Sequence, residues 1–486
     1  MKSKTKLESQ LIRILALLGI GGAALRGIFS YTVDSEIWSV SSARYLTEAG
    51  NFLYFLYYKF VFHFLLDLPY ALPLSSLTHL YVAKGIFVLN FLVLCGLCFL
   101  IFRDLTGKEQ SAWLGVLFLV SNPTWLAEGF RIRSDFLALS FSLGALHLFF
   151  RFRQSLQRKQ IGWIVAGLIL SFLSTPKAVI WNFPLLIWMG IESPRALRMT
   201  GLKIVMSAIV VGLVLLSALP ANWSLAYGAA WNHFVNSIWE QSIFTAKYWM
   251  MDWIFVYDSI LASPAQWALI FGSWLLLPFS PSRFRKPISI FNFLLLTIFI
   301  CYSPKLYFFW AALLPLFILP SILVMDWLLP KTKAVFRGAW ILFLAGTMFF
   351  WIGRLIENQS GKESFQLIQD LESFVGSRDL RIYDSMGILP RSHLVMGYLG
   401  EGDSVGNANT QMTVLANPPD IIILTSRLEI YFPQLKKETL PEKYFEVQKG
   451  LWLKKETFGD SGPPITSVEN IPMLFNQKLL LKYGPL

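Results

Sequence analysis

The sequence predicts an all-α polytopic membrane protein that carries a small external α/β domain at its C-terminus. Hydrophobic residues make up 55% of the 486 residues and charged residues only 15%. The mean hydropathy is +0.53. Soluble globular proteins carry more charge than this. The apolar runs all lie within residues 1–352, so we expect a transmembrane module there and a separate domain over 353–486.

The apolar runs predict about eleven transmembrane helices. The first run follows three lysines and has no clear small-residue cleavage site, so we expect an uncleaved signal anchor. The expected spans are 11–30, 85–102, 111–127, 136–150, 161–174, 178–190, 204–220, 264–279, 288–302, 307–329 and 338–352.

The distribution of lysine and arginine predicts the orientation. Six connecting segments hold 18 of these residues in 57 positions: 1–10, 103–110, 151–160, 191–203, 280–287 and 330–337. The five alternate segments hold 8 in 121 positions: 31–84, 121–135, 174–178, 221–263 and 303–306. Basic loops stay in the cytoplasm, so we expect the N-terminus inside and the C-terminal domain outside. The net charge of +12 therefore indicates topology, and the chain has no nucleic-acid motif.

Two of the expected spans, 161–174 and 178–190, are short. Each gives about 20 Å of helix, against a hydrocarbon core about 30 Å thick. The turn between them, residues 174–177, is expected in a recess below the outer surface. Irregular backbone is tolerated there only where it lines a wet or protein-enclosed cavity.

The two long external loops, 31–84 and 221–263, are rich in aromatic residues. Residues 51–66 of the first loop predict one or two helices in the membrane interface. The aromatic residues of the second predict either an interfacial belt or a surface for sugar rings or a prenyl chain.

The C-terminal domain is expected to contain a helix and several short strands. We expect the helix over 363–375, buried strands at 380–383 and 421–424, and a hairpin or edge strand within 444–455.

The three cysteines predict no disulfide framework. Cys95 and Cys98 form a CxxC pattern inside the apolar run 85–102, and Cys301 also lies in a span. That position favours packing residues over a metal or redox site.

Two carboxylates, Asp34 and Glu36, follow the first span on the expected outer side. A carboxylate beside a membrane-embedded site can accept a proton from an attacking acceptor group. It can also hold a divalent cation. The alternative is a pair of ordinary solvated loop acids.

The segment before the fourth span combines two acids, Glu128 and Asp135, with two arginines, Arg131 and Arg133. Arginine binds phosphate oxygens through paired hydrogen bonds. The alternative is an internal salt-bridge cluster in which Ser134 or Asp135 caps the following helix.

Two lysines, Lys177 and Lys305, each follow a proline in a short turn on the same side. The alternative role for each is a lysine that reaches to the interface. Together with Arg131 and Arg133 they could neutralise a lipid-linked phosphate or pyrophosphate as it leaves a sugar.

This layout resembles the GT-C superfamily of integral-membrane glycosyltransferases, especially the protein O-mannosyltransferase and lipid A aminoarabinose transferase branch. Asp34 and, more loosely, Glu36 match the acidic motif of the first external loop. The run from Arg133 to Asp135 matches an Arg-Pro-Asp-like motif of bacterial relatives, with serine in place of proline. Lys177 matches a lysine between helices five and six. Lys305 opens a basic and aromatic turn before a late helix. The likeness covers about residues 10–352.

The resemblance implies a glycosyltransferase of a bacterial inner membrane that uses a polyprenyl-phosphate-linked sugar. Asp34 would be the general base. Arg131, Arg133, Lys177 and Lys305 would bind the donor phosphate. Glu36, Glu128 and Asp135 would orient the cations, the sugar or a divalent metal, the one cofactor the layout leaves open. Protein, lipid and polysaccharide acceptors all fit.

Two rival functions stay open on the sequence. A lipid-carrier flippase or transporter would use the same cations, but should show inverted repeats and discontinuous helices. The sequence shows neither. A polysaccharide ligase or polymerase would differ in helix arrangement and carry a large late external loop.

Overall fold

The chain folds into two compact units. The computed structural model describes residues 2–30, 40, 60–153, 157–193, 249–301, 307–357, 366, 368–370, 372–373, 380, 382–384, 418–423, 440–448 and 451–458. The first unit holds α1, α5 from Lys84 onward, and every later helix through α18. The second holds the first two turns of α5 and the sheet.

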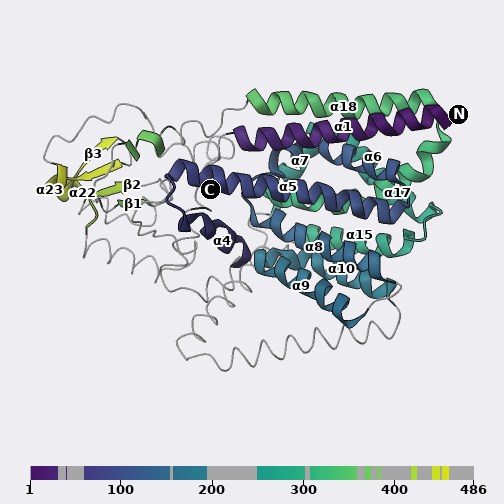
Figure 1. Cartoon of the computed structure of the whole chain (residues 1–486), viewed down its shortest axis with the longest axis horizontal. Helices are drawn as coiled ribbons and strands as arrows, with labels where there is room; N and C mark the ends of the chain where they lie inside the picture. Colours follow the sequence, from purple (N-terminus) through teal and green to yellow (C-terminus); the bar gives the residue numbers. More distant parts are fainter. Residues whose placement is uncertain are drawn as a thin grey trace. The chain divides into compact units, whose positions relative to one another are not determined.

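The first unit is a bundle of apolar helices (Figure 1). Its helices are α1 (Lys2–Phe29), α5 (Ser76–Thr106), α6 (Glu109–Val120), α7 (Pro123–Glu128), α8 (Ser134–Phe152), α9 (Arg158–Ser174), η2 (Pro176–Ala178), α10 (Val179–Glu192), α13 (Trp249–Ala262), α14 (Pro264–Leu276), η4 (Leu277–Phe279), α15 (Arg285–Cys301), α16 (Tyr307–Phe317), α17 (Leu319–Leu328), η5 (Leu329–Lys331) and α18 (Ala334–Glu357). Ahead of α5 come α4 (Phe60–Asp67), whose residues from His63 onward belong to the second unit, and η1 (Leu68–Ala71), which belongs wholly to it.

The described helices bear out a polytopic helical protein. Five of them are long and apolar enough to cross a membrane, or six if α13 and α14 form one bent span. Four shorter apolar helices have 10–17 residues. The expected span 204–220 lies outside the described residues. Each of the other ten coincides with a helix or with a pair of consecutive helices.

Helices α1 and α18 lie side by side and run parallel (Figure 1). The Nε of Arg337 lies 3.3 Å from Oε1 of Glu8, near the start of both helices. Farther along, a Cβ on Gly22 would lie 3.0 Å from Ile352. In both pairs the residue numbers rise in the same direction along the two helices. The first and last apolar helices therefore begin at the same end of the bundle.

The expected span 111–127 is broken into α6 and α7. Asn122 caps α7, because its side chain accepts hydrogen bonds from the backbone N–H of Thr124 at 3.0 Å and of Trp125 at 3.4 Å. Pro123 then occupies the first helical position, where its missing N–H costs nothing. A single run of apolar residues thus contains a local signal that ends one helix and starts the next.

Three further boundaries differ from the sequence expectation. Helix α5 begins at Ser76 rather than 85, because Ser75 Oγ accepts the backbone N–H of Thr78 at 3.2 Å and caps the helix. Part of the expected external loop 221–263 forms α13, while 221–248 lies outside the described residues. Helix α18 continues past 352 to Glu357, which moves the end of the helical module.

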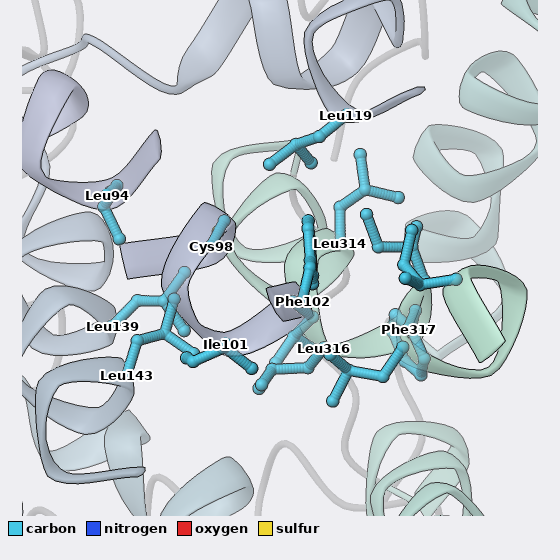
Figure 2. Packing of buried hydrophobic residues seen from close by; sticks show 14 of the residues in the cluster. Leu94, Cys98, Ile101, Phe102, Leu119, Leu139, Leu143, Leu314, Leu316 and Phe317 are labelled. Atoms are coloured by element: carbon cyan, nitrogen blue, oxygen red, sulfur yellow. The ribbon is translucent and has the colours of Figure 1, made fainter. Parts of the chain in front are cut away.

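The core of the bundle is made by apolar side chains from most of its helices. Figure 2 shows Ile101 and Phe102 of α5 between Leu139 and Leu143 of α8 on one side and Leu314 of α16 on the other. Cys95 and Cys98 are buried in the same core as free thiols, in keeping with a packing role. Among lipid chains such packing, rather than exclusion of water, holds helices together.

Gly115 of α6 is a point of close helix approach, and this predicts a packing defect. A Cβ there would lie 2.7 Å from both Phe102 and Ile322. We expect Gly115→Val to destabilise the bundle by about 1–3 kcal/mol and to lower the melting temperature in detergent. The matched control is Gly144→Val on α8, where a Cβ would meet nothing within 4 Å. Equal melting temperatures for the two variants would contradict this packing.

The second unit contains a four-stranded sheet of order β1-β2-β4-β3. The strands are β1 (Ile382–Asp384), β2 (Ile421–Ile423), β3 (Tyr444–Gln448) and β4 (Leu451–Lys454). Adjacent residues Ile421 and Ile422 of β2 are both buried, so this strand is covered on both faces. The expected strands and hairpin are therefore present. Within the expected helix 363–375, the described residues are helical.

Candidate functional site

Five of the eight predicted site residues lie in the described part of the chain. They are Glu128, Arg131, Arg133, Asp135 and Lys177. Asp34, Glu36 and Lys305 lie outside the described residues.

Four of the five lie in or directly beside a tight connection between α7 and α8. Gly129 permits it, because a Cβ there would lie 2.8 Å from the carbonyl oxygen of Trp125 and 3.0 Å from the ring of Phe91 on α5. The turn is closed by the backbone N–H of Arg131, which donates to the carbonyl of Glu128 at 3.0 Å. Gly129 and Phe130 are thereby packed against Phe91 of α5.

Arg131 makes local contacts at the end of α7. Its Nη2 lies 3.5 Å from Oε1 of Glu128, and its Nε donates to the carbonyl of Ala127 at 3.2 Å. Glu128 is buried. For this pair the geometry favours the internal salt-bridge alternative over a pair that faces a ligand.

Asp135 occupies the first turn of α8 and is 3% exposed. The expectation that Ser134 or Asp135 caps this helix is wrong. Arg133 is the N-cap, with extended backbone, and its side chain makes no capping hydrogen bond. In the part of the chain that the structure describes, Oδ1 of Asp135 accepts no hydrogen bond. The positive end of the helix dipole favours its negative charge, but burial without hydrogen bonds is costly.

Lys177 lies in η2, at the same end of the bundle as Asp135. Helices α8 and α9 form an antiparallel pair, in which Ser142 faces Ser171 with 2.8 Å between their hydroxyl oxygens. One turn away, a Cβ on Gly167 would lie 3.2 Å from Ala145. Continuing this register toward the start of α8 sets Asp135 level with η2, which packs against α8.

A buried polar cluster fixes this arrangement about two turns below Asp135. The indole N–H of Trp181 on α10 donates to Ser142 Oγ at 2.9 Å. The amide of Asn182 donates to Ser171 Oγ at 3.1 Å, and its oxygen lies 2.7 Å from Ser142 Oγ. Because the cluster joins α8, α9 and α10, it sets the height of the turn that carries Lys177.

Two further cations join this end of the bundle, and the sequence analysis missed both. Arg26 of α1 donates to the carbonyl of Leu126 at 3.2 Å and lies 5.1 Å from the ring centre of Phe130. Lys84 of α5 is 5% exposed. It lies one helical turn before Val88, which a Cβ on Gly27 would approach to 2.8 Å. The overlooked signal was a lone cation inside or beside an apolar run.

The acids of this end do not form a metal centre by themselves. Among the described residues no group of three or more His, Cys, Asp or Glu side chains is placed to hold a metal ion. Glu128 and Asp135 would need further ligands, of which Asp34 and Glu36 are the candidates.

Neither a scan of protein-family models nor a comparison with curated proteins finds a match to this chain.

Proposed function

We propose that this chain is an integral-membrane glycosyltransferase that moves a sugar from a polyprenyl-phosphate-linked donor to an acceptor at the outer face of the membrane. The proposal rests above all on the cations and buried acids that gather at the Asp135 end of a largely apolar bundle. Ionisable groups at membrane depth are expensive and are kept where a polar substrate uses them. A lipid-linked phosphate suits a site with cations at an apolar surface.

The described contacts bear on the proposed role of one cation, Arg131. Arg131, Arg133, Lys177 and Lys305 bind the donor phosphate, and Arg131 also holds Glu128 through its ion pair. Asp135 orients these cations or the sugar. Asp34 accepts the proton of the acceptor, with Glu36 beside it.

A lipid-carrier flippase stays the second candidate, because one specific observation favours it. The expectation of continuous helices fails at two places that contact each other. Helices α13 and α14 bend by 108° at Ser263. Facing this break, the amide of Asn122, between α6 and α7, donates to Gln266 Oε1 at 3.1 Å, and the amide of Gln266 donates to Ser121 Oγ at 2.6 Å. Broken helices that meet in the core are a feature of transporters.

One experiment separates the two candidates. Membrane vesicles that contain the wild-type chain are incubated with a panel of polyprenyl-phosphate hexoses and pentoses carrying a labelled sugar. A transferase moves the label out of the donor into protein, lipid or polysaccharide. A flippase leaves the donor intact but changes the leaflet in which an impermeant oxidant reaches its sugar. Transfer of no sugar from the panel would overturn the proposal.

The proposed orientation gives a labelling prediction of its own. Single cysteines at Ser42, Gln241 and Asp403 should react with an impermeant thiol reagent from outside, whereas Gln157→Cys and Ser282→Cys should not. The background needs only Cys301→Ser, because Cys95 and Cys98 are buried and Cys301 is exposed. Labelling of Gln157→Cys in intact cells would reverse the orientation.

A further inference from the structure

Two arginines flank one phenylalanine ring at the other end of the helical unit, where α8 ends and α15 begins. The guanidinium carbon of Arg153, the C-cap of α8, lies 5.0 Å from the ring centre of Phe284. That of Arg283 lies 4.6 Å from the same ring centre. Two like charges at one ring repel each other, so their proximity calls for a compensating anion.

The described residues compensate this charge only in part. Oε2 of Glu192 lies 3.9 Å from Nη1 of Arg153. This is longer than the donor–acceptor distance of a charge-assisted hydrogen bond, which is about 2.7–2.9 Å. Within the described residues, neither Arg153 nor Arg283 donates a side-chain hydrogen bond. Burial and the adjacent Arg283 lower the pKa of Arg153, whereas Glu192 and Asp104 raise it. No described side chain therefore occupies the N–H groups of Arg153 and Arg283 with a hydrogen bond, which leaves them able to bind a ligand.

The surroundings favour an anion with an apolar body. The N-terminus of α15, at Arg285, brings its partial positive charge directly after Arg283 and Phe284. The side of the ring away from solvent is closed by aromatic packing, with Phe150 at 5.7 Å from Phe284 between ring centres and Trp188 at 5.5 Å from Phe150.

Exposed apolar side chains lie on α15 and on η4, just before it in the chain. Phe279 of η4 is 73% exposed and Phe293 of α15 is 69% exposed. Arg153 directly follows the candidate span Ser134–Phe152, so its guanidinium lies at the boundary between apolar and polar surface. Phospholipid phosphates occupy this level of a bilayer, and basic pockets between helices on the cytoplasmic side bind acidic headgroups.

We propose that Arg153 and Arg283 bind the phosphate of an acidic phospholipid headgroup. The site is separate from the proposed donor site and does not depend on it. The competing explanation is that Arg153 only neutralises Glu192 and the C-terminal end of α8. That explanation gives Arg283 no role, so the Arg283→Gln variant distinguishes the two explanations.

The test measures lipid binding to the full chain in detergent by native mass spectrometry. Phosphatidylglycerol and a phosphatidylcholine of the same acyl chains are titrated onto the wild type, Arg153→Gln, Arg283→Gln and the matched control Arg151→Gln. Arg151 is an exposed cation at the same helix end. We expect the wild type to prefer phosphatidylglycerol. Each of the first two variants should bind it about ten-fold more weakly or worse, and the control should bind as the wild type does.

Three results would overturn the proposal. One is an unchanged affinity for phosphatidylglycerol in Arg283→Gln, which removes an exposed side chain and should fold normally. Another is an equal loss in Arg151→Gln, which would show a general effect of charge. The third is displacement of the lipid by millimolar inorganic phosphate, which would assign the arginines to a soluble anion.

Discussion

Asp34→Asn is expected to nearly abolish sugar transfer while the protein still inserts and binds its donor. The change keeps the size of the side chain but removes its basicity. A general base contributes roughly 10²–10⁴-fold to a rate. The measurement is the initial rate of label transfer from the polyprenyl-phosphate sugar identified in the vesicle assay. Donor that co-purifies with the variant, quantified by mass spectrometry, reports whether binding is retained.

Glu36→Gln is the matched control for this change. It removes a carboxylate from the same loop, two residues away, and its spacing departs from the acidic motif that Asp34 matches. We expect a smaller loss of rate than for Asp34→Asn. Full transfer activity in Asp34→Asn would remove the proposed base. Translocation of donor without transfer in the wild type would favour the flippase.

Composition predicted the helices well because each helix of a membrane bundle needs a long apolar run. Even the short pair α9 and α10 could be recognised as two helices, since Pro176 and Lys177 interrupt the apolar run. The strand at Ile421 was equally clear, because three consecutive isoleucines between turn residues suit a strand buried on both faces.

The breaks in the helices could not be read in the same way. A hydropathy window averages over many residues, so the polar step at Ser121 and Asn122 disappears within an apolar run. Helix α13 was hidden for the opposite reason, since Asp252 and Asp258 lower its apolar count. Only the fold shows that the two breaks share hydrogen bonds across about 140 residues of sequence.

The sequence predicted which residues form the site, but not which of them contact each other. The spacing of Glu128 and Arg131 is that of neighbours on one helical face, so their ion pair could have been expected. That Arg26 and Lys84 belong to the same end of the bundle depends on how α1 and α5 pack, which no local pattern encodes. That Asp135 does not cap α8 likewise depends on the backbone conformation of Arg133, which is the N-cap.

Arg133→Ala and Lys177→Ala are each expected to weaken donor binding by roughly 10–150-fold, the equivalent of about 1.5–3 kcal/mol for a lost charge-assisted hydrogen bond. Folding should be largely retained, because these side chains are only half-buried and lie at helix ends. Affinity is measured by titrating the purified full chain with the polyprenyl-phosphate sugar, and melting temperature is recorded for each variant.

Arg131→Ala is the informative comparison at the same end of the bundle. It should lower the melting temperature more than the other two changes, because it removes the ion pair that Arg131 makes with the buried Glu128. Its effect on donor affinity should be smaller than that of Arg133→Ala. Arg151→Ala, at the other end of α8, should change neither quantity. Unchanged donor affinity in both Arg133→Ala and Lys177→Ala would assign these cations to helix-end stability and leave the donor phosphate without its proposed ligands.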